Sequence, residues 1–169
     1  VAPFDDVYEV EVVHAGSRTL DDGEVDQLYR LYENVRAENL DLNTFPLPRT
    51  FLRAMAGSPG WELLVFRLRD DPARGPVCFL ASHLGDELYT PLLTGLDYDL
   101  VRERGLYRQM LRHGTLRARK LGKRQVHFGF GASLEKRRFG ARPIESTMFL
   151  EADDHYAFDA LAHIAAEAG

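Results

Sequence analysis

The sequence predicts one α/β domain (α+β in stricter terms) in which helices flank a mixed, mostly antiparallel central sheet. Two observations support this class. Apolar residues recur with strand and helix periods in the order strand, two helices, three strands, helix, strand, helix, strand, helix. The 169 residues, 45% of them hydrophobic, suit a single domain with a buried core. We expect this domain to span 1–169, and because the chain starts at Val1 we expect it to be excised from a longer one.

The first half of the chain predicts a strand, two helices and a strand hairpin. Asp21 or Asp22 can cap a helix that runs to about Glu38, because apolar residues recur there at three- and four-residue spacing. The other elements expected in this half are a strand over 8–13, a helix over 49–55 and strands over 61–68 and 77–82.

The second half begins with a third strand, expected over 87–93. Pro91 cannot donate a ladder hydrogen bond, so it marks an edge, a bulge or a splay in this strand. A long basic helix follows from about Leu106 and is stopped by Gly122. The remaining expected elements are a strand over 125–128, a glycine loop, a short basic helix, a strand over 144–151 and a helix over 155–168.

Three arginines gather at the start of the long helix. Arg102, Arg104 and Arg108 flank Gly105. A helix N-terminus offers unpaired N–H groups and a partial positive charge. The arrangement therefore predicts an anion pocket, with an arginine-rich, solvated helix face as the plain alternative.

The same residues carry a family resemblance. Segment 102–107, RERGLY, resembles the (Gln/Arg)-x-x-Gly-x-(Gly/Ala) loop of the GNAT acyltransferases. In that family the amides of this loop and the helix behind it hold the pyrophosphate of coenzyme A. The resemblance implies that Gly105 and Leu106, with the three arginines, bind the donor. Tyr107 departs from the pattern, which has glycine or alanine there.

A second segment, 129–140 (GFGASLEKRRFG), is similar to the glycine loop and Tyr-Lys-x-x-Phe-Gly motif of the FemAB-like branch of that superfamily. The resemblance implies that Gly129 and Gly131 let the backbone approach a ligand and that Lys136 lies near the donor or acceptor. Glu135 stands where the branch usually carries tyrosine. The acid that protonates the leaving thiolate in many members is therefore missing. Either Tyr107 substitutes for it from the helix start, or the thiolate leaves unprotonated.

The resemblance also implies where the donor lies. In the GNAT fold the fourth and fifth strands splay apart, and the acyl-pantetheine arm enters between them. Here those strands are 87–93 and 125–128. Amides near Leu93 and Thr94 would then bond the pantetheine and polarise the thioester carbonyl.

Transfer of an acyl group to an amine also needs a base for the ammonium proton. The candidates on or beside the splayed strands are His127, Glu87 and His83. The imidazole of His127 alternates away from its apolar neighbours, and the ordinary imidazole pKa of ~6.5 suits proton uptake near neutrality. A histidine held by structural partners is the plain alternative.

Charge is distributed unevenly along the chain. The net charge is −5, yet residues 97–142 hold 13 of the 21 basic residues and only four acidic ones, a local balance of +9. Such a basic stripe on an acidic protein predicts a phosphorylated ligand or an acidic partner. Nucleic acid fits less well, because the stripe lacks the repeated aromatic residues of a base-stacking surface.

Other chemistries lack their motifs. No metal-ligand spacing, dinucleotide fingerprint or Gly-x-Ser-x-Gly sequence is present, so we expect no metal. Cys78 is the one cysteine, which excludes an internal disulfide and fits a reducing compartment. It lies in an apolar run, so we expect it to be a buried small hydrophobic residue, with a reactive thiol as the alternative. No apolar run reaches the ~18 residues of a membrane span, and no signal peptide is visible. We therefore expect a cytoplasmic protein with no membrane partner.

The sequence thus predicts a GNAT-like acyltransferase. The acyl group would move from a coenzyme A or carrier-protein thioester to a small amine acceptor. The alternative is a catalytically silent GNAT-fold module that binds an acyl carrier protein or a fused or partner enzyme. The FemAB-like resemblance also leaves aminoacyl-tRNA donors open.

Overall fold

The computed structural model describes residues 4, 6–38, 46–129, 133–145 and 154–167. The strands are β1 Tyr8–His14, β2 Trp61–Leu68, β3 Pro76–Leu84, β4 Leu88–Leu96 and β5 Gln125–Val126. The helices are α1 Asp22–Glu38, α2 Thr50–Gly57, α3 Tyr98–Glu103, α4 Leu106–Lys120, α5 Ser133–Arg138 and α6 His155–Glu167, with one 3₁₀ turn at Pro72–Arg74.

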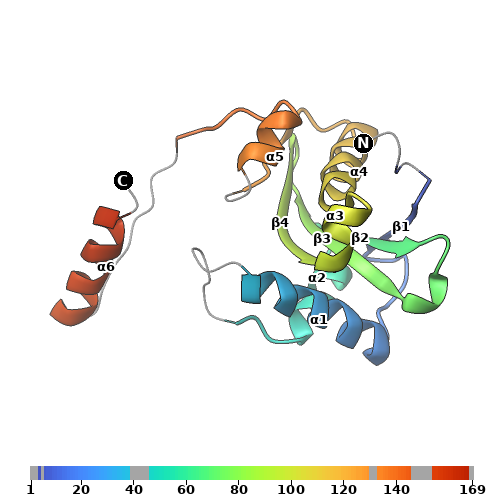
Figure 1. Cartoon of the computed structure of the whole chain (residues 1–169), viewed down its shortest axis with the longest axis horizontal. Coiled ribbons are helices and arrows are strands. Elements are labelled where there is room, and N and C mark those ends of the chain that lie inside the picture. The colour runs from blue at the N-terminus through green and yellow to red at the C-terminus, as the bar shows by residue number, and fades with distance from the viewer. Residues whose placement is uncertain (1–3, 5, 39–45, 130–132, 146–153, 168–169) are drawn as a thin grey trace.

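The five strands form one mixed sheet in the order β1-β2-β3-β4-β5 (Figure 1). The first four are antiparallel to their neighbours, and β5 pairs with β4 in parallel. The predicted fold class, a mixed and mostly antiparallel sheet flanked by helices, is therefore confirmed.

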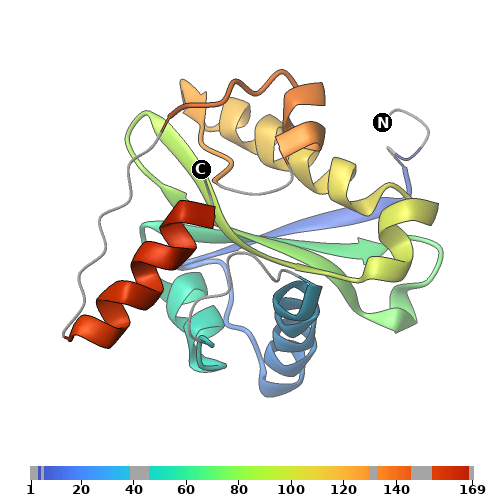
Figure 2. The ribbon, with the colours of Figure 1, turned by 60° about the vertical axis from the view of Figure 1, so that its left-hand side comes forward.

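Helices cover both faces of the sheet (Figure 2). Helices α1 and α2 pack on one face, where Leu28 and Leu52 join Phe79 of β3 in one core cluster. Helices α3 and α4 pack on the other face, where Leu106 and Met110 contact Leu80 and its neighbours in a second cluster. This double cover explains why β2 and β3 are apolar on both faces rather than alternating.

Several predicted boundaries were wrong. Strand β4 continues to Leu96 because Gly95 pairs with Phe79, and only a glycine fits there: an added Cβ would lie 2.4 Å from the Phe79 ring. Strand β5 has two residues where four were expected. Helix α3 was not predicted; Asp97 caps it by accepting a hydrogen bond from the N–H of Asp99.

The C-terminal predictions are only partly testable. Helix α6 lies where a terminal helix was expected. Ile144 and Glu145 are not in a strand, and the rest of the predicted strand, like Gly131, lies outside the described residues. Among the described residues no helix has both the length and the apolar character needed to cross a bilayer. Nor does any group of three or more His, Cys, Asp or Glu side chains in this part of the chain have a metal-binding arrangement.

Candidate active site

Strands β4 and β5 separate soon after they pair. The paired positions are Leu88 with Gln125 and Tyr89 with Val126, and the N–H of His127 donates to the Tyr89 carbonyl at 2.9 Å. Gly129 then turns the chain away with a φ of +63°, in the left-handed region. Beyond Pro91, therefore, β4 has no strand partner on this side within the described part of the chain. The predicted splay of the fourth and fifth strands is present.

Strand β4 contains a β-bulge where the gap begins. Pro91 pairs with Ser82 and Leu93 with Ala81, so Leu92 has no partner in β3. The Leu92 side chain is 54% exposed. The proline thus marks both a bulge and the start of the gap.

Leu93 and Thr94, the predicted donor contacts, follow the bulge directly. Leu93 packs against the α1–α2 core cluster. The Thr94 hydroxyl lies 2.7 Å from the Phe79 carbonyl oxygen and 2.9 Å from Sδ of Met110. The Thr94 side chain therefore holds β4 to β3 and α4. Any contact of Thr94 with an acyl donor would use its backbone.

Helix α4 lies on the face of the sheet opposite α1 and α2. Gly105 caps it in the left-handed conformation, with φ 59° and ψ 28°. The N–H of Gln109 donates to the Gly105 carbonyl at 3.0 Å and opens the helical ladder. The N–H groups of the three residues before Gln109 therefore have no carbonyl of their own helix to bond and face the helix N-terminus, as an anion site requires.

The three arginines do not converge on this site. Arg104 donates to Asp70 at 2.6 Å, and Arg108 donates to Glu135 at 2.8 Å. Arg102 is exposed and makes no ion pair with any residue that the structure describes. The expected pocket of three guanidinium groups is thus not assembled. Two of the three pair with Asp70 and Glu135, and the sequence pattern did not predict these pairs.

Aromatic side chains frame the helix start. Tyr107 is half-buried, and burial raises the pKa of its phenol to about 12, with Glu135 adding to the shift. The phenol therefore stays protonated at neutral pH, and the raised pKa makes it a weaker acid than an ordinary tyrosine. The ring of Phe4 packs against Gly105, since a Cβ placed there would lie 3.0 Å from its Cδ2 atom.

Lys136 holds the start of the glycine loop. Its side chain is buried, and Nζ donates to the carbonyl of Gly129 at 3.2 Å. Burial lowers the pKa of this ammonium. The lysine thus fixes the point at which the chain leaves β5.

The three candidate bases lie in different surroundings. His127 is exposed and lines a cavity of about 400 Å³ between β5, α5 and Thr115 of α4. Glu87 precedes β4 and pairs with Arg124 at 3.0 Å, at the closed end. His83 lies on β3, edge-on to Trp61. Of the three, His127 directly follows the last paired residue of β5.

A sequence profile of the acetyltransferase (GNAT) domain matches residues 3–137. The chain belongs to the GNAT acetyltransferase family. Its activity is therefore acyl transfer, as the sequence predicted.

Solved structures share the architecture of this GNAT domain. The aminoglycoside acetyltransferase meta-AAC0020 from an uncultured soil metagenomic sample matches with a TM-score of 0.63 at 16% identity, over 89% of this chain and 99% of its own. An acetyltransferase of Trypanosoma brucei matches with 0.60 at 15% identity, over 85% and 100%. A predicted acetyltransferase of Clostridium acetobutylicum, solved with acetyl-CoA, matches with 0.61 at 7% identity, over 85% and 96%. No curated protein sequence matches the chain.

The GNAT domain contains a buried polar cluster that sequence reasoning missed. Glu62 of β2 has no exposed surface, and it accepts hydrogen bonds from the Tyr89 phenol at 2.9 Å and from Arg117 at 2.7 Å. The cluster joins β2, β4 and α4 at the closed end of the gap. One sequence signal was available, because a carboxylate stands inside the apolar run of β2.

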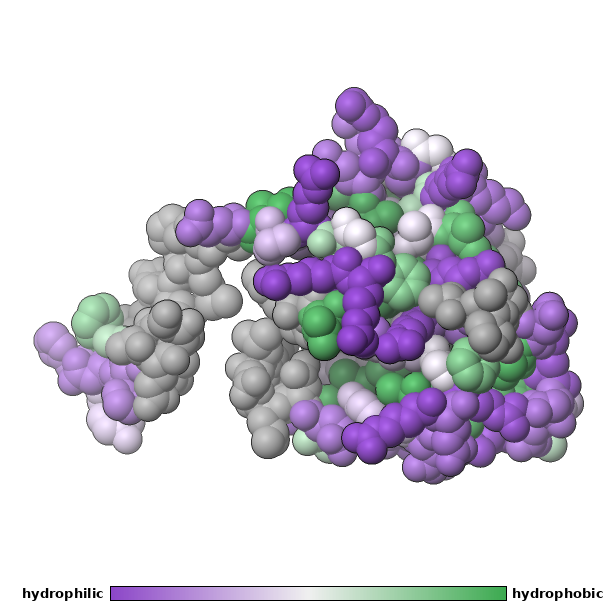
Figure 3. Space-filling model, turned by 45° about the horizontal axis from the view of Figure 1, so that its top comes forward, coloured by the Kyte–Doolittle hydropathy of each residue, from purple (hydrophilic) through white to green (hydrophobic). Residues whose placement is uncertain are grey.

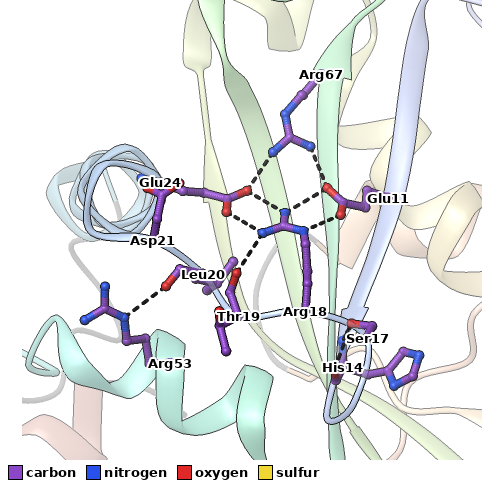
Figure 4. Close-up of polar contacts among 10 residues, drawn as sticks. All are labelled: Glu11, His14, Ser17, Arg18, Thr19, Leu20, Asp21, Glu24, Arg53 and Arg67. Carbon is purple, nitrogen blue, oxygen red and sulfur yellow. Dashed lines mark hydrogen bonds and ion pairs between the residues drawn. The ribbon is translucent and has the colours of Figure 1, made fainter.

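A second network fixes the first turn of α1 in the GNAT domain (Figure 4). Arg18 and Arg67 each bond both Glu11 of β1 and Glu24 of α1, at 2.5–2.9 Å. Two cations and two carboxylates alternate, so each charge has opposite neighbours. Arg67 lies 56 positions from Glu11 and 43 from Glu24 in the chain, which explains why the sequence did not show the network.

Proposed function

We propose that this GNAT domain moves an acyl group from the thioester of coenzyme A, or of a phosphopantetheine carrier protein, to a small amine. The observation that carries the proposal is the gap between β4 and β5, which opens at the Leu92 bulge. In this arrangement the pantetheine arm lies along the unpaired edge of β4. Successive N–H groups of a strand point to opposite edges, so one of the two at Leu93 and Thr94 then faces the thioester carbonyl and stabilises its developing negative charge.

The helix start suits the donor phosphate. The backbone N–H groups of Leu106, Tyr107 and Arg108 offer bonds that do not depend on the paired arginines. The left-handed Gly105 supports this role, because a residue with a side chain would be strained there. Arg102, exposed and outside any described ion pair, supplies an uncommitted positive charge three residues before Gly105.

The transfer is direct rather than through an acyl-enzyme. Cys78, the one cysteine of the chain, is fully buried, and burial raises the pKa of its thiol. A neutral, inaccessible thiol cannot attack a thioester. The amine therefore attacks the bound donor itself, in a complex that holds donor and acceptor together.

Two residues handle the protons. We assign the base that takes the amine proton to His127, which directly follows the last paired residue of β5 and lines the cavity beside α5, with Glu87 as the second candidate. We assign protonation of the leaving thiolate to Tyr107, because its phenol stays protonated and lies at the helix start.

Features of α5 support the FemAB-like assignment within the family. The Lys136 ammonium and the Gly129 carbonyl, both parts of the similar segment, are in contact at 3.2 Å. Glu135, at the position of the branch tyrosine, bonds Arg108 of α4 instead. The segment thus joins β5 to the start of α4 through ionic contacts.

A silent binding module is the second candidate. It is favoured by the ion pairs of Arg104 and Arg108, which remove two charges from the phosphate site. The discriminating experiment is to incubate the chain with acetyl-CoA or an acetylated carrier protein and a panel of small amines, and to follow N-acetyl products by mass spectrometry. Product formation with sequential kinetics supports the transferase, whereas tight donor binding without product supports the module.

A further inference from the structure

Helix α4 presents a basic row to solvent on the side away from the sheet. Its core side is made by buried residues such as Leu106, Met110 and Ala118. On the opposite side, basic residues recur at helical spacing around one leucine, Leu116, which is 44% exposed. The row consists of Arg108, Arg112, Leu116, Arg119 and Lys120.

Helix α5 extends this row sideways. Glu135 accepts hydrogen bonds from Arg108 at 2.8 Å and from Arg138 at 2.6 Å, so one carboxylate lies between two guanidinium groups. Leu134 is 62% exposed beside it. We call the α4 row together with Leu134 and Arg138 the basic surface. Figure 3 shows hydrophilic side chains gathered over this side of the molecule, with hydrophobic patches among them.

The charge of the basic surface is only partly compensated. Glu135 is the one acidic residue on α4 and α5. Arg119 and Lys120 make no ion pair within the part of the chain that the structure describes. Because residues outside 97–142 carry a net charge of −14, this surface is a localised positive field on an acidic protein.

The composition of the basic surface points to a protein helix as its partner. Arginines with interspersed leucines match an amphipathic helix that offers carboxylates and apolar side chains. Nucleic acid would use the charges but leave Leu116 and Leu134 without contacts, since its backbone is polar and base stacking needs aromatic rings.

The surroundings of the α4 N-terminus favour a carrier-protein thioester over coenzyme A as the acyl donor. In the GNAT family the amides of the loop before this helix hold the pyrophosphate of coenzyme A, but the side chains around the loop in this chain are less favourable for a pyrophosphate. Arg104 and Arg108 are already bonded to carboxylates, Phe4 packs against Gly105, and Tyr107 replaces a small residue. A carrier protein presents a single phosphate at the base of its pantetheine arm and gains the rest of its binding from its own surface.

We propose that the basic surface docks an acidic helix of a carrier protein, whose phosphopantetheine thioester is the acyl donor of this domain. The inference rests on the proposed function and specifies its donor. In the reaction the amine forms the new C–N bond, the thioester C–S bond breaks, and the amine proton goes to the base. Tyr107 protonates the thiolate, so that the arm leaves as the free thiol, and the base returns its proton to Tyr107 through solvent.

The test compares three acetyl donors with the full chain: an acidic fatty-acid carrier protein carrying acetyl-phosphopantetheine, acetyl-CoA and acetyl-pantetheine. The double variant Arg119→Glu, Leu134→Asp should raise the KM for the acetylated carrier at least about tenfold. Its kcat with acetyl-pantetheine should stay at the wild-type value, which also shows that the variant folds. Arg30→Glu, an exposed charge on α1, is the matched control and should change neither.

Other outcomes separate the two proposals. Transfer from acetyl-CoA with a lower KM than from the carrier, unchanged in the double variant, would overturn the docking surface but keep the transferase. No transfer from any donor would overturn the transferase, while salt-sensitive carrier binding that the double variant abolishes would still support the docking surface. If the chain binds a transfer RNA more tightly than the carrier protein, and the double variant loses this binding, the choice of partner is overturned.

Discussion

The phenol of Tyr89 donates a hydrogen bond of 2.9 Å to the fully buried carboxylate of Glu62. The same Tyr89 accepts the N–H of His127 through its carbonyl, and Glu62 is held from α4 by Arg117. One residue thus ties the closed end of the β4–β5 gap to the sheet on one side and to α4 on the other.

Breaking this anchor should destabilise the domain strongly. Glu62→Leu leaves the guanidinium of Arg117, which is 18% exposed, without its carboxylate. We expect a loss of ~3–5 kcal/mol in the free energy of unfolding, as for other broken buried pairs. Tyr89→Phe should cost ~1.5–3 kcal/mol, because one bond to a charged acceptor is lost.

Urea unfolding measures both effects, and the chain offers a matched control. Glu87→Gln breaks the exposed pair with Arg124, whose side chains are 67% and 73% exposed, and should cost ~0–1 kcal/mol. Equal losses for Glu62→Leu and Glu87→Gln would contradict the buried anchor.

Acid should weaken the network at the start of α1. Hydrogen bonds from Arg18 and then Arg67 lower the pKa of Glu11 to about 2 from its ordinary 4.5. A carboxyl whose folded pKa is lowered stabilises the fold fully above its unfolded pKa and loses that effect as the pH falls through the folded one. The stability gap between wild type and Glu11→Gln should therefore be constant near neutrality and close between about pH 4.5 and 2. Unfolding curves across this range test it, and a gap that does not change with pH would speak against the network.

The left-handed Gly105 should control donor binding. Gly105→Val strains the backbone at φ 59° and meets the ring of Phe4, so we expect the KM for the donor to rise by at least about tenfold. Asparagine tolerates the left-handed conformation better than other residues with side chains. Gly105→Asn should therefore lose less, and equal KM values for Val and Asn variants that are folded by circular dichroism would show that the conformation does not matter.

Proton transfer should depend on His127. The rate of amine acylation should rise with pH through one ionisation, and His127→Gln should lower kcat by ~10²-fold or more while donor affinity stays nearly constant. His83→Gln is the control, because His83 lies on β3 against Trp61. Full activity in His127→Gln would move the role of base to Glu87 or to solvent.

Much of the fold followed from local patterns. The order of the elements from β1 to α5, apart from α3, the start of α4 at Leu106 and the irregularity at Pro91 all came from residue spacing and backbone chemistry. Residues that pair across long sequence separations could not be found in this way. The partners of Arg104 and Arg108, which are Asp70 and Glu135, depend on how the loops pack.

The candidate site was therefore predicted unevenly. Gly105 lies at the start of α4, where local sequence placed it, and the β4–β5 splay lies where the family resemblance implied it. Side-chain contacts were not predicted: the Thr94 hydroxyl holds β4 in place, while the expected backbone contact of Thr94 with the donor stays a prediction. Glu62 was missed because a buried carboxylate can be recognised only when its partners on other elements are known.

The most direct test of the central claim is whether a thioester donor occupies the β4–β5 gap. Leu92→Cys places an accessible thiol at the bulge, and Cys78 is too buried to react. Acetyl-pantetheine at saturation should slow alkylation of this thiol at least about tenfold, since a bound ligand excludes the reagent, and should leave a Leu116→Cys control on α4 unaffected. Equal alkylation rates of Leu92→Cys with and without donor, in a protein that binds the donor, would place the thioester elsewhere and contradict the account.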